Sequence, residues 1–199
     1  MKKKLILVTA PPACGKNYVS ELICNALNDV AYVDKDDLAD LLRCSFTLSG
    51  EKLDMDGEFY RKHLRPVEYA TLLRIAFSTL RYTNYVLVNA PFIKEVRDIE
   101  YMRMLKERVA SMGAELVVIW VTAPIEVCYE RMKKRNAERD VLKLSTWQEY
   151  VKNIDYNPPY TLQATNVVDK LFTFDNTNEI TAKESLQHIL DGLGDNLWN

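Results

Sequence analysis

The sequence lacks the features that mark several classes of protein. No apolar run approaches the roughly 20 residues that a membrane span needs, and Pro11-Pro12 follow the opening MKKKLILV too soon for a signal peptide. The four cysteines show no C-x-x-C pair and no metal-ligand spacing, so we expect reduced thiols in the cytoplasm. The formal net charge of −2 gives no electrostatic reason to bind nucleic acid or a membrane surface.

Repeats, low-complexity segments and linkers are also missing, and the 199 residues, 48% of them hydrophobic, suit one domain over residues 1–199. What the sequence does contain is an alternation of short apolar runs with amphipathic segments. We expect strands at 5–8, 30–33, 85–88, 116–121 and 170–174, and helices at 17–27, from 38 onward, at 66–82, 94–112, 145–152 (with Ser145 as N-cap) and 181–193. Because strands alternate with helices, the sequence predicts a doubly wound α/β fold with a parallel sheet.

The stretch 5–20, LILVTAPPACGKNYVS, carries the clearest functional pattern. A buried strand, a tight loop and a helix opened by Gly15-Lys16 place backbone N–H groups and a lysine ammonium around a phosphate group. Against the pattern G-x-x-x-x-G-K-[ST], positions 10–17 read A-P-P-A-C-G-K-N. The expected nucleotide-binding residues here are Pro12, Ala13, Cys14, Gly15, Lys16, Asn17 and Tyr18. The alternative is an ordinary strand-to-helix turn with a chance Gly-Lys pair.

Carboxylates follow the second strand, in the order Asp34-Lys35-Asp36-Asp37. Ligands in open α/β sheets bind beyond the carboxyl ends of the strands, so these carboxylates should lie near the phosphate loop. Asp34 and Asp36 are candidate general bases, and Asp37 is a further candidate substrate contact. Aspartates at this position also cap helices, and we expect one of them to cap while another reaches the substrate.

Basic residues suggest two further elements of a site. Arg131, Arg135 and Arg139 recur every four residues, and on a continuous helix they would form a stripe that folds over ATP as a lid at 131–144. The alternative is a solvated basic face. Arg97 opens the helix after the third strand against the helix dipole, which indicates an anionic partner or, equally, a pairing with Glu95 or Asp98.

The stretch from 44 to 65 is the least regular part of the sequence, because Gly50 and Gly57 interrupt it and acidic residues crowd it. We expect residues 44–82 to form a helical insertion that binds the acceptor substrate. Arg61 is the candidate contact within this segment, with Tyr60 and Arg65 beside it.

Together these motifs resemble the P-loop kinases that phosphorylate small molecules or nucleic-acid ends, a group that includes polynucleotide kinases, zeta toxins, and gluconate and shikimate kinases. The matching positions are the loop at 10–17, Asp34-x-Asp36-Asp37, the pair Arg131/Arg135 and Asp175-Asn176-Thr177. The resemblance implies a five-stranded parallel sheet in the order 2-3-1-4-5 and MgATP as phosphoryl donor. It also implies adenine near Asn176 and Thr177 and Asp36 as the base. The arginine spacing, in turn, makes Arg135 the strongest candidate for a catalytic charge in the lid.

Four positions depart from the patterns of these kinases, and the first is Ala10, which replaces the first Gly of the loop pattern. Asn17 stands where a Ser or Thr hydroxyl ligates Mg²⁺, and Asn89 stands where the third strand often ends in an acidic residue. Both offer a neutral carbonyl oxygen, so we expect Mg²⁺ at Asn17 and Asp34, bound more weakly than usual unless Asp34 holds it through water. Ala39 stands where polynucleotide kinases carry an Arg, which argues against a nucleic-acid end as substrate.

The sequence therefore predicts an ATP-dependent phosphotransferase that acts on a hydroxyl group of a small molecule, without a membrane partner. One alternative is a kinase of nucleic-acid 5′-hydroxyl groups, which the low net charge disfavours. Another is a nucleotide-binding regulatory module with weak turnover, since Asn17 and Asn89 replace the usual metal ligands.

Overall fold

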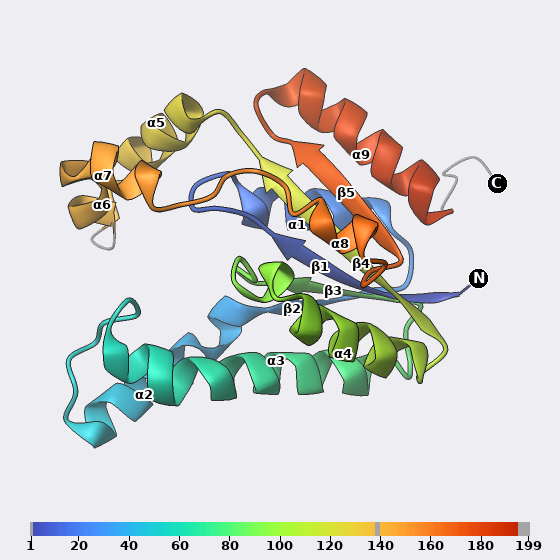
Figure 1. Ribbon diagram of the computed structural model, residues 1–199, viewed down its shortest axis with the longest axis horizontal. Helices are drawn as coiled ribbons and strands as arrows, with labels where there is room; N and C mark the ends of the chain where they lie inside the picture. Colours follow the sequence, from blue (N-terminus) through green and yellow to red (C-terminus); the bar gives the residue numbers. More distant parts are fainter. Residues whose placement is uncertain (1, 138–139, 195–199) are drawn as a thin grey trace.

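The computed structural model describes residues 2–137 and 140–194 and shows one parallel sheet of five strands in the order β2-β3-β1-β4-β5 (Figure 1). The strands are β1 (Lys3–Thr9), β2 (Val30–Asp34), β3 (Tyr85–Asn89), β4 (Ala114–Thr122) and β5 (Lys170–Asp175). The expected fold class and strand order are thus confirmed. The three inner strands are covered on both faces, which explains why their sequences read as continuous apolar runs.

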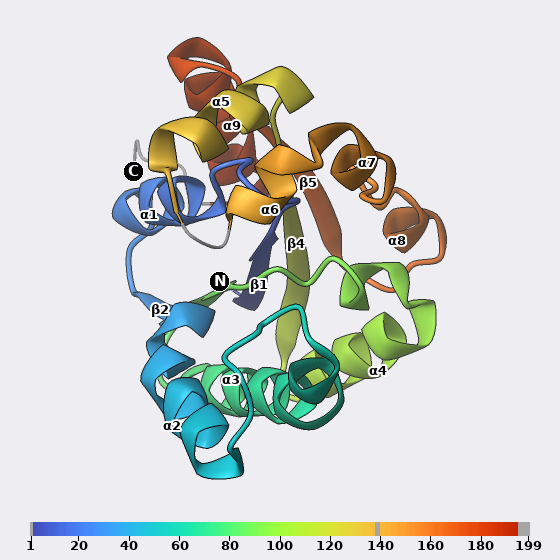
Figure 2. The same ribbon diagram turned by 90° about the vertical axis from the view of Figure 1, so that its left-hand side faces the viewer.

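Helices cover both faces of the sheet, as Figure 2 shows. On one face α1 (Lys16–Ala26) and α9 (Glu179–Leu193) pack against Ile6 and Val8 of β1. On the other face α3 (Arg65–Thr79) and α4 (Ile99–Ala110) pack against Leu5 and Leu7. Alternate residues of a strand point to opposite faces, so β1 contributes to both halves of the core.

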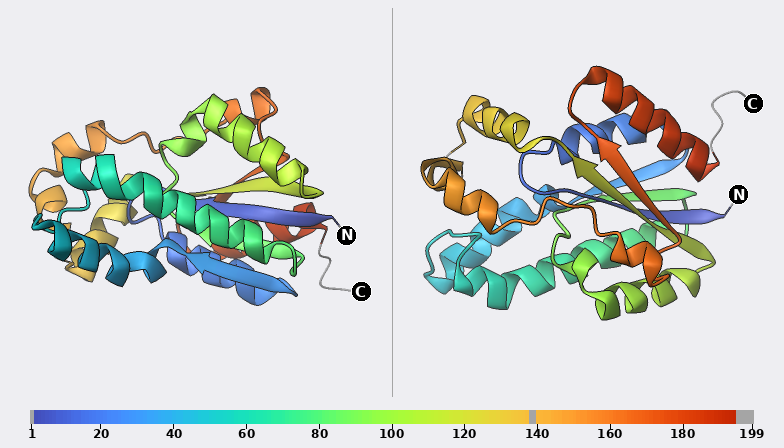
Figure 3. Two further views of the ribbon diagram at one scale, coloured as in Figure 1. Left: turned by 90° about the horizontal axis from the view of Figure 1, so that it is seen from below. Right: turned by 45° about the horizontal axis from the view of Figure 1, so that its top comes forward.

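The remaining helical segments gather toward the carboxyl ends of the strands, except α8 (Figures 1 and 3). They are η1 (Lys35–Leu38), α2 (Ala39–Ser49), the π-helical η2 (Tyr60–Leu64), η3 (Glu95–Arg97), α5 (Ile125–Arg135), α6 (Val141–Ser145), α7 (Trp147–Lys152) and α8 (Thr161–Ala164). Because ligands of open α/β sheets bind beyond the carboxyl ends of the strands, this arrangement surrounds the expected site. None of the described helices is long and apolar enough to cross a membrane.

Two expected boundaries before β4 were wrong. The stretch after Cys44 is not irregular at first, because α2 continues to Ser49 and ends at Gly50, which has the left-handed conformation that favours glycine. The helix expected at 94–112 is two segments, η3 and α4. Asp98 separates them with an extended backbone, and its side chain accepts a hydrogen bond from the N–H of Tyr101, which caps α4.

The expected continuous helix through the arginine stripe was also wrong. The α5 helix ends at Arg135 because Asn136 adopts a left-handed conformation. Arg131 and Arg135 therefore share one helix, while Arg139 lies outside the described residues. Ser145 is no N-cap, since it ends α6 and its hydroxyl donates to the carbonyl oxygen of Leu142.

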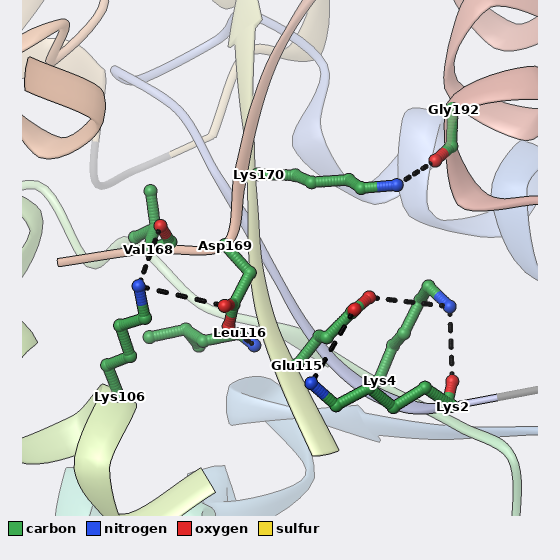
Figure 4. Close-up of polar contacts among 9 residues, drawn as sticks. All are labelled: Lys2, Lys4, Lys106, Glu115, Leu116, Val168, Asp169, Lys170 and Gly192. Carbon is green, nitrogen blue, oxygen red and sulfur yellow. Dashed lines mark hydrogen bonds and ion pairs between the residues drawn. The ribbon is translucent and has the colours of Figure 1, made fainter. Parts of the chain in front are cut away.

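Lysines stabilise the other end of the sheet, where β4 and β5 begin (Figure 4). The Lys106 ammonium lies 3.3 Å from the carbonyl oxygen of Val168 and 3.6 Å from the Asp169 carboxylate. The Lys170 ammonium donates to the carbonyl oxygen of Gly192 in α9. These contacts join both helical layers to the start of β5.

Candidate nucleotide and phosphoryl-transfer site

A tight loop joins β1 to α1 and brings Gly15 and Lys16 to the helix N-terminus. Gly15 has φ +92° and Ala13 has φ +65°, so the loop turns through the left-handed region twice. A Cβ atom at Gly15 would lie 2.1 Å from Nδ2 of Asn176, so both the conformation and the space require glycine there. A strand, a turn of this kind and a helix N-terminus form an anion-binding arrangement.

The loop is held in place by residues from two distant elements. Asn176, which follows β5, donates from Nδ2 to the carbonyl oxygen of Cys14 over 2.8 Å. Arg131 of α5 donates to the same oxygen over 3.3 Å and to the carbonyl oxygen of Asn176 over 2.7 Å. Two residues expected to bind nucleotide thus also fix the shape of the phosphate loop.

A pocket of about 430 Å³ adjoins the loop on the side of α9, which is within the range of small-ligand sites. Its lining residues are Gly15, Tyr18, Arg131, Asn176, Asn178, Glu179 and Ala182. The sequence pointed to Tyr18, Arg131 and Asn176 but missed Asn178 and Glu179. Thr177 turns instead toward Asp175, to which its N–H and its hydroxyl donate hydrogen bonds.

A polar cluster lies on the other side of Lys16, with the buried side chain of Asn89 at its centre. Asn89 ends β3, next to Asp34 of β2 in the parallel register. Its Oδ1 atom accepts from the Lys16 ammonium and, over 3.2 Å, from the Ser20 hydroxyl. Its Nδ2 atom lies 3.1 Å from Oδ1 of Asn17 and 2.7 Å from Oδ2 of Asp34.

Asp34 accepts hydrogen bonds on both of its carboxylate oxygens. Oδ1 accepts from the Asp36 N–H over 2.9 Å, so Asp34 is the aspartate that caps η1, while Oδ2 accepts from Tyr32 and Asn89. Burial acts to raise the pKa of the Asp34 carboxyl group, but these three hydrogen bonds outweigh it. The nearby Lys16 charge acts in the same direction, and the pKa of Asp34 lies below its usual value.

This cluster contains oxygen atoms of the kind that ligate a hard cation. Oδ1 of Asn17 and the carboxylate of Asp34 both contact Nδ2 of Asn89, which brings them to one place. Mg²⁺ in nucleotide sites takes one or two carboxylates and completes its shell with phosphate oxygens and water, so these residues fit it. No group of three His, Cys, Asp or Glu side chains able to hold a metal occurs among residues 2–137 and 140–194.

The expected acceptor-side residues come from three different segments, η1, η2 and η3. Asp36 and Asp37 lie exposed in η1, immediately beyond the end of β2, and Arg61 is exposed in η2. Arg97 contacts neither Glu95 nor Asp98 in an ion pair. Its guanidinium pairs with the Asp155 carboxylate over 3.0 Å, so it joins η3 to the segment after α7.

In the expected lid segment, Arg135 is held by the buried carboxylate of Asp140. The two contacts are 2.8 Å from Nε and 2.6 Å from Nη2 of Arg135. Lys143 of α6 lies 3.7 Å from the Asp56 carboxylate, in the loop before η2, so the expected lid segment contacts the expected acceptor-binding segment.

Sequence reasoning missed Tyr32, Ser20 and Asp140. Strand periodicity could have found Tyr32, because residues two apart on a strand share a face and Asp34 was already a candidate. Helix spacing could have found Ser20, four residues after Lys16 on α1. Asp140 carried no signal, since its contact with Arg135 depends on the turn that ends α5.

The comparisons with known proteins agree with this arrangement. A family model described as an AAA domain, AAA_33, matches residues 5–156. A candidate kinase from Chloroflexus aurantiacus has 20% identity and a TM-score of 0.63, covering 98% of both chains. Shikimate kinase from Bacteroides thetaiotaomicron has 12% identity and a TM-score of 0.55, covering 98% of this chain and 99% of that one. A sugar kinase from a Janibacter species has 13% identity and a TM-score of 0.55, covering 98% and 95%.

These identities are low, so the three structures show a shared fold. No curated protein sequence matched the chain significantly. The family model, in contrast, spans more than half of the chain and includes both the phosphate loop and the polar cluster. The chain therefore belongs to the AAA_33 family of AAA domains, and its parallel sheet in the order β2-β3-β1-β4-β5 has the P-loop kinase fold.

Proposed function

We propose that this protein is an ATP-dependent phosphotransferase that moves the γ-phosphate of MgATP to a hydroxyl group of a small molecule. The observation that carries the proposal is the meeting of three adjacent strand ends, those of β1, β3 and β2. The loop after β1 presents Gly15 and Lys16, and hydrogen bonds connect Lys16 through Asn89 to Asp34 at the end of β2. Phosphoryl transfer needs a phosphate cradle, charge neutralisation and a group that orients the attacking hydroxyl.

Each of these roles has a candidate. The loop N–H groups and Lys16 bind the phosphates, and Arg135 adds positive charge from the lid once it leaves Asp140. Asn17 and Asp34 would hold Mg²⁺, which neutralises phosphate charge when it is bound. Asp36 accepts the proton of the acceptor hydroxyl, because it is exposed beyond the strand end whereas Asp34 is tied into the cluster.

The acceptor in this proposal is a small molecule. Shikimate kinase and a sugar kinase share the fold over nearly the whole chain, which supports this class of acceptor. A net charge of −2 and Ala39 at the polynucleotide-kinase arginine position count against a nucleic-acid end. Asn17 and Asn89 favour a second candidate, a nucleotide-binding module with weak turnover.

The test measures nucleotide binding and phosphate transfer separately. ATP and ADP binding is measured by calorimetry, and transfer is measured with radiolabelled ATP across sugars, hydroxy acids, nucleosides and a 5′-hydroxyl oligonucleotide. We expect Lys16→Ala to lose nucleotide binding and Asp36→Asn to bind nucleotide but lose transfer. Asp40→Asn is the matched control, since Asp40 is exposed and pairs only with Arg43 among the described ion pairs.

Three outcomes would change the proposal. Full transfer by Asp36→Asn would remove Asp36 as the base. ATP binding without transfer to any acceptor would favour the regulatory module, and transfer to the oligonucleotide alone would favour the nucleic-acid kinase.

A further inference from the structure

The carboxylate of the polar cluster lies at the end of β2, while β3 ends in the neutral Asn89. We propose that Tyr32 is a positioning residue that, together with Asn89, orients Asp34 as the anionic ligand of the metal–nucleotide complex. The inference rests on the proposed function and deepens it, because it assigns a role to a tyrosine that does not itself contact nucleotide or metal.

The register of the β2–β3 pair and the alternation of side chains along β2 bring Tyr32, Asp34 and Asn89 together. Asp34 is paired with Asn89 across the β2–β3 ladder, and Tyr32 precedes Asp34 by two residues on the same face of β2. The Tyr32 hydroxyl donates to Oδ2 of Asp34 and accepts from Nδ2 of Asn89 over 2.8 Å. One oxygen of Asp34 is thus oriented by two side-chain donors.

The hydrogen bonds also explain why position 89 carries an amide. Its Oδ1 atom accepts from Ser20 and Lys16, which leaves Nδ2 to face Asp34 over 2.7 Å. A carboxylate in place of the amide would put two carboxylate oxygens at that distance, where both groups cannot be ionised together. With Asp34 present, residue 89 therefore serves as donor and orienting group, and the negative charge belongs to Asp34.

Core packing does not account for the Tyr32 hydroxyl. Tyr32 as a whole residue is 41% exposed, so its ring is not needed to fill the interior. Its hydroxyl nevertheless joins Asp34 and Asn89 in one network. Groups that hydrogen-bond a metal-ligating carboxylate fix its orientation, and losing one commonly costs about 10-fold or more in metal affinity.

The experiment is a double-mutant cycle on Tyr32 and Asp34. The quantity compared between the variants is the midpoint of the MgCl₂ titration of ADP binding. ADP affinity is measured by calorimetry in EDTA and across a MgCl₂ titration, and Mn²⁺ paramagnetic resonance reports metal in the ternary complex directly. We expect Tyr32→Phe to raise the Mg²⁺ midpoint about 10-fold, with a much smaller change of ADP affinity in EDTA. In an Asp34→Asn background the same change should shift the midpoint less than about twofold, because Tyr32 acts through Asp34.

Tyr82→Phe is the matched control, since it removes a hydroxyl from a tyrosine that is 83% exposed and outside the cluster. ADP binding in EDTA shows for each sample that the phosphate loop is folded. The inference is overturned if Tyr32→Phe keeps the wild-type Mg²⁺ midpoint, or if its effect is as large in the Asp34→Asn background. If the wild type binds no ADP with or without Mg²⁺, the proposed function fails and this inference with it.

Discussion

The side-chain amide of Asn176 donates a hydrogen bond of 2.8 Å to the carbonyl oxygen of Cys14, and so ties the residue after β5 to the loop after β1. The two residues are 162 positions apart in the sequence. The loop carbonyl thereby points toward α5 and the residue after β5. The phosphate-binding shape of the loop therefore depends on the correct folding of the last strand.

Replacing Gly15 by alanine tests this dependence. The left-handed backbone costs alanine about 1–2 kcal/mol, and the new Cβ would lie 2.1 Å from Nδ2 of Asn176. Because the amide must move and lose its bond to Cys14, we expect unfolding free energy to fall by roughly 2–4 kcal/mol. ADP binding should be lost at the same time. Urea denaturation and calorimetry measure the two effects.

Gly50→Ala provides the comparison for that variant. Gly50 is also left-handed, with φ +72°, but apart from Gly50 and its two chain neighbours no heavy atom of the described residues lies within 4 Å of the position that a Cβ atom would take there. We expect only the backbone cost of about 1–2 kcal/mol and unchanged ADP affinity. Equal losses of stability and binding in both variants would show that the contact with Asn176 does not shape the loop.

Asn17→Ser should leave nucleotide affinity similar, and its Mg²⁺ dependence should be unchanged or improved. A serine hydroxyl is a smaller oxygen donor at the first turn of α1, and it removes the amide that now contacts Lys16 and Asn89. We expect ADP affinity in EDTA to stay within about twofold and the Mg²⁺ midpoint to fall or stay the same, since Mg²⁺ demands small, near-octahedral oxygen shells. A titration by calorimetry decides, and complete loss of nucleotide binding would contradict the expectation.

Glu68 supports the structure behind the candidate base. Its carboxylate lies 2.8 Å from the Lys35 ammonium and accepts a hydrogen bond of 2.5 Å from Tyr60, and its side chain is fully buried. Glu68→Ala would leave the Lys35 ammonium and the Tyr60 hydroxyl without their carboxylate partner inside the protein. We therefore expect the free energy of unfolding to fall by about 3–5 kcal/mol. Thermal and urea unfolding measure this. Asp40→Ala, which breaks an exposed ion pair with Arg43, should cost far less, and equal costs would show that burial of the Glu68 pair is unimportant.

Much of the fold was predictable because each part rests on a local pattern. Short apolar runs, the Gly15-Lys16 helix start and the alternation of strands and helices need only nearby residues to be recognised. The strand order came from the resemblance to P-loop kinases. The break at Asp98 was missed because the apolar spacing continues across it, and only the cap contact with Tyr101 reveals it.

The candidate site was predictable only in part, for the same physical reason. Asp34 ends β2 and Lys16 opens the helix after β1, so topology alone predicts that they lie at the same end of the sheet. The contact of Arg97 with Asp155 and that of Arg135 with Asp140 depend on where loops turn, which side-chain spacing does not encode. The roles of these residues in substrate binding and catalysis remain predictions.

The cysteines should react with an alkylating reagent in a definite order. Cys44 is exposed and should be modified first, whereas burial raises the pKa of Cys24 to about 11 and so keeps its reactive thiolate scarce at neutral pH. Cys14 and Cys128 are buried with their Sγ atoms 3.6 Å apart, and the contact with Cys128 together with burial raises the pKa of the Cys14 thiol. We expect these two to react last, and ADP to slow Cys14 further because Cys14 belongs to the phosphate loop. A time course with iodoacetamide, analysed by peptide mass spectrometry, measures the order, and modification of Cys14 before Cys44 would mean that the loop is not packed against α5.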